Sequence, residues 1–295
     1  MPIAPVRRPQ PVRQAPAPLG RIVAGGMLRR NTPVQDYTAE YGLWVKREDL
    51  ACPLPGPPFS KARGVYAHLL SRPETLIGVL DTQHSQAGWA VARACQVLKK
   101  QAVNYYPVFK RELDDNDPPQ HELRNPQIKS SGLGAALVAL PAGRSAILYH
   151  SAKRDCESRG GYMMPNALKL IESITETAAE VAGLFDNVLV AISSGTIAAG
   201  VIRGFRDRGG KLPRFLIHLG YSRSHEEVER YLREASGCPA VPTMLIDEHY
   251  AYSDKASAGP TPSFPCNEYY DLKAFRWWMA NREKFPGRTL MWNIG

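Results

Sequence analysis

Short apolar runs that predict strands alternate with amphipathic stretches that predict helices through most of this chain, and this alternation constrains its fold most. We expect strands at 41–46, 76–80, 102–109, 135–140, 145–149, 187–192 and 214–218. We expect helices at 61–70, 88–99, 166–182, 195–208, 225–235 and 271–281. This order predicts an α/β fold with mostly parallel, twisted sheets and helices on both faces. Ligands of such sheets bind beyond the carboxyl ends of the strands.

Three polar turns lie at strand-to-helix junctions and are therefore candidates for one common site. The first contains Lys61, within the segment KREDLACPLPGPPFSKARG at 46–64. A lysine at the start of a helix lies near the positive end of the helix dipole, and partial burial lowers its pKa further. Lys61 is therefore a candidate amine for a Schiff base, an interpretation that depends on the pattern around it and not on the lysine alone.

The second junction follows the apolar run NVLVAI and consists of Ser193, Ser194, Gly195 and Thr196. Exposed amides at a helix N-terminus, together with hydroxyl groups and a glycine, form a binding site for an anion such as phosphate. The alternative is an ordinary N-cap turn that uses Ser or Thr.

The third junction lies in DTQHSQAGWAVARA at 81–94, where a polar turn again precedes a helix. Its side chains are those of Thr82, Gln83, His84, Ser85 and Gln86. A carboxylate or a ring hydroxyl would find hydrogen-bond donors there, although a capped helix after a turn has the same composition.

A fourth motif, FPCNEYYDLKAFRWW at 264–278, contains Tyr269, Tyr270 and Asp271 before an amphipathic helix. The aromatic residues on that helix are expected in the core. Asp271 is either the N-terminal cap of the helix or a carboxylate that faces the nitrogen of a heterocycle.

The formal net charge of +9 is concentrated at the start of the chain. Residues 1–30 contain six arginines and no acidic residue, which leaves only +3 (9 − 6) for the remainder. This segment is rich in Pro and Arg, so we expect a disordered basic tail. Such a tail contacts phosphates or acidic surfaces, or serves solubility alone.

Several other functional classes are excluded by the sequence. No apolar run is long enough to span a bilayer. Five cysteines without a Cys-x-x-Cys pair indicate reduced thiols in a cytoplasmic protein and no metal site. The segment HEEVE at 225–229 lacks the second histidine of a zinc protease helix. Neither a Gly-x-Ser-x-Gly elbow nor a glycine-rich nucleotide loop is present.

Taken together, KREDL…PFSKARGVY, the strand and turn at 187–196, and the run YDLK at 270–273 resemble the fold-type II family of pyridoxal-phosphate enzymes. This family includes tryptophan synthase β, threonine dehydratase, cysteine synthase and aminocyclopropane-carboxylate deaminase. The resemblance runs intermittently from residue 41 to 280. It implies a homodimer with a tryptophan synthase β-like fold and two α/β domains. The larger, cofactor-binding domain would comprise 31–70 and 150–295, and the smaller one, 71–149, would carry a mobile lid at 111–126.

The resemblance also implies residues that hold pyridoxal 5'-phosphate. Lys61 would form the Schiff base, and residues 193–196 would bind the phosphate. Gln86 or His84 would stand near the cofactor hydroxyl, where the family has an Asn or a similar group. Asp271 would pair with the pyridine nitrogen, as the acid of the corresponding run does in the deaminase branch.

For the substrate, the resemblance implies that Thr82, Gln83 and Ser85 bind a carboxylate. Once an incoming amine displaces Lys61, this lysine would act as general base or acid, with Tyr270 and Tyr269 as further candidates for moving protons. An acid at the ring nitrogen favours α-carbanion chemistry of the deaminase, lyase or decarboxylase type.

Three functions remain open from the sequence. The first is a pyridoxal-phosphate enzyme acting on a small amino acid. The second is such an enzyme acting on an amino-acid group attached to a modified DNA base or nucleotide, with the basic tail contacting DNA. The third is a relative that has lost catalysis and binds a ligand or partner through the old cleft.

Overall fold

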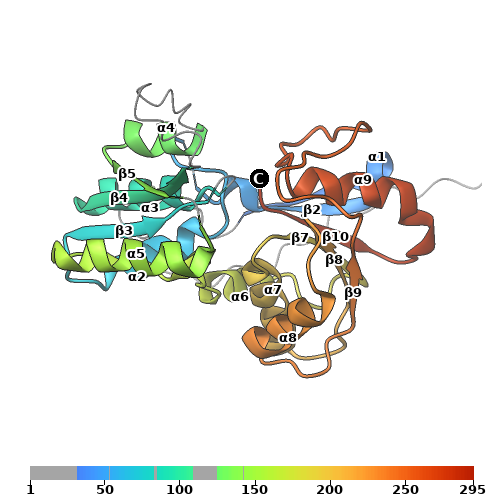
Figure 1. The fold of residues 1–295 in the computed structure, drawn as a ribbon. Coiled ribbons are helices and arrows are strands. Elements are labelled where there is room, and N and C mark those ends of the chain that lie inside the picture. The colour runs from blue at the N-terminus through green and yellow to red at the C-terminus, as the bar shows by residue number, and fades with distance from the viewer. Residues whose placement is uncertain (1–31, 53, 83–84, 109–124, 142) are drawn as a thin grey trace, which may run out of the picture.

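The computed structural model describes residues 32–52, 54–82, 85–108, 125–141 and 143–295, which form two α/β units side by side (Figure 1). The expected fold class, with mostly parallel sheets and helices around them, is confirmed. The basic tail at 1–30, Gln83, His84 and most of the expected lid at 111–126 lie outside the described residues. The expectations for these segments stay predictions.

The larger unit is built on a six-stranded sheet in the order β1-β2-β10-β7-β8-β9. Its strands are β1 (Val34–Tyr37), β2 (Leu43–Arg47), β7 (Asn187–Ile192), β8 (Arg214–Leu219), β9 (Thr243–Ile246) and β10 (Thr289–Asn293). β1 pairs antiparallel with β2, and the other described pairs in the sheet are parallel. Because β10 pairs with both β2 and β7, segments from the two ends of the chain meet within one sheet.

Helices cover both faces of this sheet. They are α6 (Glu172–Ala179), α7 (Thr196–Arg208), α8 (His225–Ser236) and α9 (Asp271–Asn281). Within β7, Val188 and Val190 pack in the core formed with α6, α7 and α8, whereas Leu189 and Ala191 pack in the core formed with α9. Every residue of β7 is buried, which explains why its sequence is a continuous apolar run.

The smaller unit contains a fully parallel four-stranded sheet in the order β5-β4-β3-β6. Its strands are β3 (Leu76–Leu80), β4 (Gln101–Val108), β5 (Ala136–Pro141) and β6 (Tyr162–Met163). Its helices are α2 (Ala62–Leu70), α3 (Ala87–Leu98), α4 (Asn125–Gly132) and α5 (Ser145–Ser158). Ile77 and Val79 pack with α2 and α3, and Leu80 and Val103 pack with α5 on the other side of the sheet.

Two of the expected elements differ in the structure, and the strands β1, β6, β9 and β10 are not among those expected. The segment 145–149, expected as a strand, opens α5, because its buried residues Leu148, Ala152 and Cys156 recur every four residues. The helix expected over 166–182 is interrupted: a 3-10 turn at Asn166–Leu168 precedes α6.

Two segments of the larger domain that the family resemblance implies contact the smaller sheet. Residues 62–70 and 150–163, assigned to the larger domain, pack on the smaller sheet. Val65 and Leu69 of α2 join the core over β3, and Ala152 and Cys156 of α5 join the core on the opposite face. The division into domains stays a prediction.

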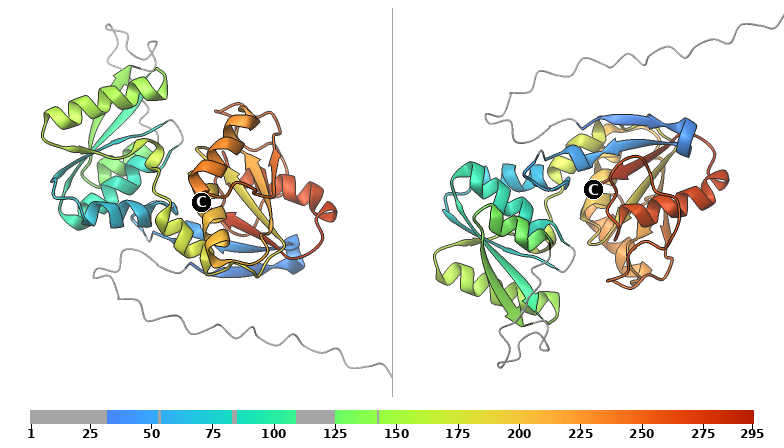
Figure 2. Two further views of the ribbon diagram at one scale, coloured as in Figure 1. Left: turned by 90° about the horizontal axis from the view of Figure 1, so that it is seen from below. Right: turned by 90° about the horizontal axis from the view of Figure 1, so that it is seen from above.

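The two units place the carboxyl ends of β3 and β7 toward each other. Both views in Figure 2 show the C-terminal end of the chain between the units. Gly295 there accepts a hydrogen bond from Gln86 of the smaller unit at 3.4 Å. Within the ranges that the structure describes, no helix has the length and apolar character needed to cross a membrane.

Candidate active site

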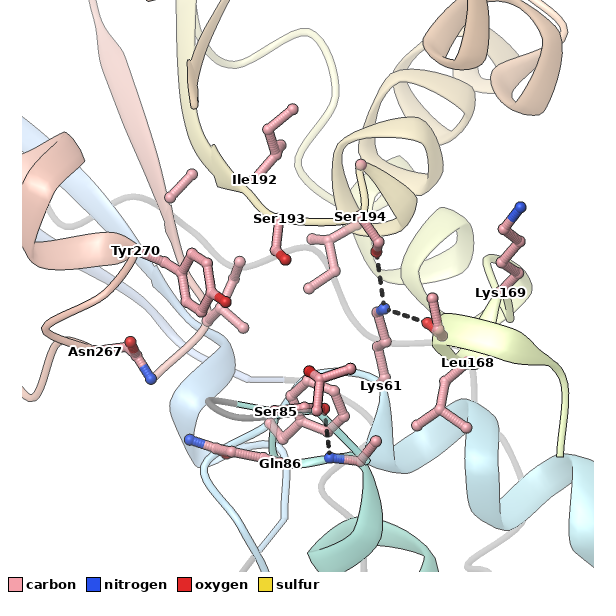
Figure 3. A pocket seen from close by; sticks show the side chains of 18 of the residues that line it. Lys61, Ser85, Gln86, Leu168, Lys169, Ile192, Ser193, Ser194, Asn267 and Tyr270 are labelled. Carbon is pink, nitrogen blue, oxygen red and sulfur yellow. Dashed lines mark hydrogen bonds between the residues drawn. The ribbon is translucent and has the colours of Figure 1, made fainter. Parts of the chain in front are cut away.

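A cavity of about 500 Å³ lies between the two units, within the range of about 300–1,000 Å³ that is typical of small-ligand pockets (Figure 3). Lys61 lines it from the start of α2, Ser85 and Gln86 from the start of α3, and Ser193 and Ser194 from the turn after β7. The structure therefore brings the three strand-to-helix junctions to one place, beyond the carboxyl ends of parallel strands.

Lys61 is 6% exposed, and its Nζ makes two hydrogen bonds at the wall of this cavity. It donates to the Ala167 carbonyl at 2.8 Å and to Ser194 Oγ at 3.3 Å (dashed lines in Figure 3). Burial lowers the pKa of Lys61 from 10.5 to about 7. A substantial fraction of the amine is therefore neutral near pH 7, and the neutral amine is the nucleophilic form.

The carbonyl that holds Lys61 belongs to an unusual turn. Ala167 has φ 55° and Leu168 has φ 45°, both in the left-handed region that residues with a side chain rarely adopt. Each such residue costs about 1–3 kcal/mol, and conformations of this kind concentrate at functional sites. Here the turn directs a backbone acceptor at the Lys61 amine across 106 residues of sequence.

The turn after β7 has the features of an anion site. Gly195 is the N-cap of α7 with φ 81°, and a Cβ at this position would lie 3.0 Å from two ring carbons of Tyr231. Ser194 Oγ lies 3.0 Å from Thr196 Oγ1 and also accepts from the Thr196 amide at 3.5 Å. Hydroxyl groups and first-turn amides of a 13-residue helix thus converge beside Lys61.

The turn before α3 contributes Thr82 and Ser85 to the cavity wall. Ser85 Oγ accepts from the Ala87 amide at 3.0 Å, so that its hydroxyl is oriented by the first turn of the helix. Thr82 Oγ1 accepts from the Tyr252 hydroxyl at 3.1 Å, a contact that links the two units. Gln83, also assigned to a substrate carboxylate, lies outside the described residues.

Gln86 lines the same cavity, and its amide is only partly used. Nε2 donates to the Gly295 carbonyl, while Oε1 is buried without a hydrogen-bond partner among the described residues. A buried amide oxygen of this kind is expected to have a partner when the site is filled. His84, the alternative predicted for this role, lies outside the described residues.

Asp271 is fully buried, opens α9 and lines the cavity. Its Oδ2 accepts from the Gly295 amide at 3.1 Å, whereas Oδ1 has no hydrogen-bond partner within the described part of the chain. Burial raises the pKa of Asp271 to about 7, and the charge of Asp49 acts in the same direction. A protonated ring nitrogen would supply the partner that Oδ1 lacks and would favour the carboxylate form.

The two tyrosines before Asp271 occupy different environments. Tyr270 lines the cavity, and burial raises its pKa above the ordinary range, so its hydroxyl stays protonated. Tyr269 does not line this cavity, and its ring lies 5.9 Å from the Lys255 amine. The structure therefore brings Tyr270, but not Tyr269, to Lys61 and Asp271.

The sequence prediction missed further residues at the cavity wall, namely Tyr221, Arg223, Tyr252 and Lys169. Tyr221 and Arg223 follow β8 directly, so the signal that identified the turn after β7 applies to them too: polar residues after a buried parallel strand. Tyr252 and Lys169 lie in irregular segments, where no periodic pattern marks them. The described ranges contain no cluster of three or more His, Cys, Asp or Glu that would hold a metal ion.

Comparison with family models gave no match. Among curated proteins, a "Glycyl-dTMP PLP-dependent decarboxylase" of Pseudomonas phage M6 is 48% identical over 285 residues, which cover 91% of this chain and 100% of the relative.

Solved structures show the same fold at low sequence identity. A homologue of aminocyclopropane-carboxylate (ACC) deaminase has a TM-score of 0.70 at 18% identity, covering 91% of this chain and 90% of its own. Diaminopropionate ammonia lyase from Escherichia coli has a TM-score of 0.63 at 15% identity, with coverages of 92% and 85%. Maize serine racemase has a TM-score of 0.63 at 13% identity, with coverages of 91% and 88%.

Proposed function

The chain belongs to the fold-type II family of pyridoxal-phosphate-dependent enzymes, and we propose that it is a decarboxylase acting on an α-amino-acid group carried by a thymidine nucleotide. The observation that supports this most directly is the 48% identity to the phage decarboxylase over that protein's whole length. The site geometry supports it independently, because a buried lysine with a low pKa, an anion turn and a carboxylate with one unpartnered oxygen line one cavity.

The side chains at the cavity fit pyridoxal 5'-phosphate. Lys61 would hold the aldehyde carbon, and residues 193–196 would hold the phosphate. Asp271 would face the ring nitrogen with its unpartnered Oδ1, and Gln86 would face the ring hydroxyl with its unpartnered Oε1. Each of these buried polar atoms would thereby gain the partner that it lacks. These assignments extend the sequence expectations for the same residues.

When bound, pyridoxal phosphate links covalently to a primary amine and withdraws electrons from the adjacent carbon. A decarboxylase of this class needs a carbon that bears both a free amine and a free carboxylate. A glycyl unit on the nucleotide therefore has to be joined through its α-carbon. Overall, the α-carbon loses CO₂ and takes up one proton, and the product keeps its primary amine.

The protein residues would orient the substrate and supply that proton. Thr82 and Ser85 carry the hydroxyl groups that would bind the substrate carboxylate beside the Lys61 amine. Because the pKa of Lys61 lies near 7, its Nζ both accepts and releases a proton at neutral pH. Tyr270, whose hydroxyl stays protonated, is the second proton donor at the cavity.

The test is to incubate the purified protein with pyridoxal phosphate and a thymidine nucleotide bearing an α-glycyl group. We expect release of CO₂, with proton uptake and a primary amine as product. Lys61→Ala should abolish both the visible absorbance of the holoenzyme and the CO₂. Lys211→Ala, on an exposed side chain, is the matched control. Release of ammonia instead of CO₂ would reject decarboxylation in favour of a deaminase or lyase.

A homodimer and contact of residues 1–30 with DNA are further parts of this proposal, and a small free amino acid is the alternative substrate. Their tests are CO₂ release from free amino acids, sedimentation of the holoenzyme, and DNA binding with and without the tail. A tail that binds through arginines would give an affinity that falls steeply with salt.

A further inference from the structure

Beside the residues assigned to the cofactor, the cavity has a second group of side chains that the chemistry described above does not use. Tyr221 and Arg223 come from the segment between β8 and α8, and Tyr252 comes from the connection between β9 and α9. All three are partly exposed and line the same cavity as Lys61. We call them the outer subsite.

The two aromatic rings of the outer subsite are held in a defined arrangement. Their centroids lie 5.0 Å apart with an interplanar angle of 86°, an edge-to-face pair. The Tyr252 hydroxyl also donates to Thr82 Oγ1, in the turn assigned to the substrate carboxylate. A planar group attached to the α-carbon of a substrate held at this turn would therefore meet the rings directly.

The charge of the outer subsite favours an anion. Arg223 donates from Nη1 to the Ser193 carbonyl, which fixes the guanidinium beside the anion turn, and its Cζ lies 5.8 Å from the Tyr221 ring. In the described part of the chain, Arg223 forms no salt bridge, so its charge is not neutralised by a carboxylate. A guanidinium fixed in this way is suited to bind a phosphate.

Basic residues also outnumber acidic residues in the described lining of the whole cavity. Its basic members are Lys61, Lys169 and Arg223, whereas Asp271 is its single acidic member among the described residues. Because Lys61 would be joined to the cofactor, Lys169 and Arg223 are the cationic side chains of the described lining that are left to bind anionic groups.

From these observations, and resting on the function proposed above, we propose that the outer subsite binds the nucleotide portion of the substrate. Tyr221 and Tyr252 contact the pyrimidine base and the sugar, and Arg223 binds the 5'-phosphate. Aromatic side chains bind bases by stacking, with little dependence on which base is present. The phosphate contact would then distinguish a nucleotide from a free amino acid.

The test measures binding of thymidine 5'-monophosphate and of thymidine to the holoenzyme by calorimetry. The holoenzyme is used because its cofactor occupies the anion turn, which would otherwise bind the added phosphate. We expect Arg223→Gln to weaken binding of the monophosphate about 10- to 100-fold and binding of thymidine less than about twofold, as for loss of a charged hydrogen bond. Arg230→Gln, on the exposed side of α8, is the control and should change neither.

A separate variant tests the aromatic residues of the outer subsite. Tyr221→Leu should weaken both ligands by about 5- to 100-fold, the range for loss of a base-stacking side chain. An unchanged visible spectrum in each variant shows that the cofactor site is intact. If Arg223→Gln binds thymidine 5'-monophosphate as tightly as the wild type does, the phosphate assignment is wrong. If the wild type binds neither ligand, the proposal of a nucleotide-binding subsite is wrong.

Binding of an oligothymidylate strand tests whether the nucleotide group bound by the outer subsite belongs to DNA or to a free nucleotide. Tighter binding of the strand than of the monophosphate, again lost in Arg223→Gln, would support the subsite with DNA as its source. Binding of the monophosphate alone would support it with free nucleotide as its source. These readouts need no turnover, so monophosphate binding without CO₂ release would reject the decarboxylase and keep the subsite.

Discussion

Replacing Lys61 with methionine tests the central physical claim about the site, which is that burial makes charging of this amine costly. The folded protein lowers the pKa of Lys61 from its ordinary value of 10.5 to about 7, chiefly by desolvation. A difference of 3.5 pH units (10.5 − 7) corresponds to about 5 kcal/mol of differential interaction between the charged and neutral forms. Methionine has a similar length and no charge, so it removes this cost.

The sign of the effect follows from proton linkage. Between pH 7 and 10.5 the unfolded chain holds a proton on Lys61 that the folded protein has largely released. The free energy of unfolding of the wild type without cofactor therefore rises with pH across this window. Relative to the wild type, the methionine variant gains most at low pH, and this gain should shrink by about 2 kcal/mol between pH 7 and pH 9. Loss of the hydrogen bond to Ala167 adds an offset that varies little with pH.

The assay is urea unfolding of both cofactor-free proteins at pH 7, 8 and 9, with the difference between variants taken at each pH so that other titrating groups cancel. Lys211→Met, on an exposed lysine, should show no pH-dependent difference. As a second readout, the rate at which the wild type gains visible absorbance with pyridoxal phosphate should rise with pH around a midpoint of about 7. Parallel stability curves and a midpoint near 10 would refute the argument.

Two further substitutions test the other proposed cofactor contacts. Gly195→Ala should cost about 1–2 kcal/mol of stability for its left-handed φ of 81° and also weaken cofactor binding, because the added Cβ meets Tyr231. Gly183→Ala, with φ 82° and nothing within 4 Å of the added Cβ, should lower the unfolding midpoint while leaving the cofactor Kd unchanged. Asp271→Asn should reduce CO₂ release on the order of 100-fold with the visible band retained, because an amide cannot balance a protonated ring nitrogen. Full activity of Asp271→Asn would contradict the proposed role of Asp271 at the ring nitrogen.

The parts of the site that the sequence predicts are those encoded locally. Residues 193–196 follow an apolar strand directly, and Lys61 follows β2 after a proline-rich turn. Both open a helix, so a short window contains both the structural and the chemical signal. The place of Asp271 at the start of a helix leaves a helix cap and a ring-nitrogen partner both open, and the family resemblance of the run YDLK implies the second. The fold class follows from repetition of this pattern, since strand and helix runs alternate along much of the chain.

What the sequence does not predict depends on contacts between distant segments. The Ala167 carbonyl reaches Lys61 across 106 residues, and the Tyr252 hydroxyl reaches Thr82 across 170. Neither the Ala167 carbonyl nor the Tyr252 hydroxyl has a sequence signature, because each contact forms only when distant segments of the chain fold together. The apolar run in 145–149 is also ambiguous by itself, and only the four-residue spacing of its buried side chains through α5 identifies a helix.

The solved structures that share this fold belong to proteins named for different reactions. At 13–18% identity they share this architecture, yet their names include a deaminase homologue, an ammonia lyase and a racemase. The shared fold therefore cannot decide the reaction, which has to come from individual side chains. In this chain Asp271 is buried at the start of α9, where, under the proposed function, a change would affect the reaction at the cofactor. Tyr221 and Arg223 lie on the segment between β8 and α8, where, under the proposed function, a change would alter substrate binding and leave the core packing intact.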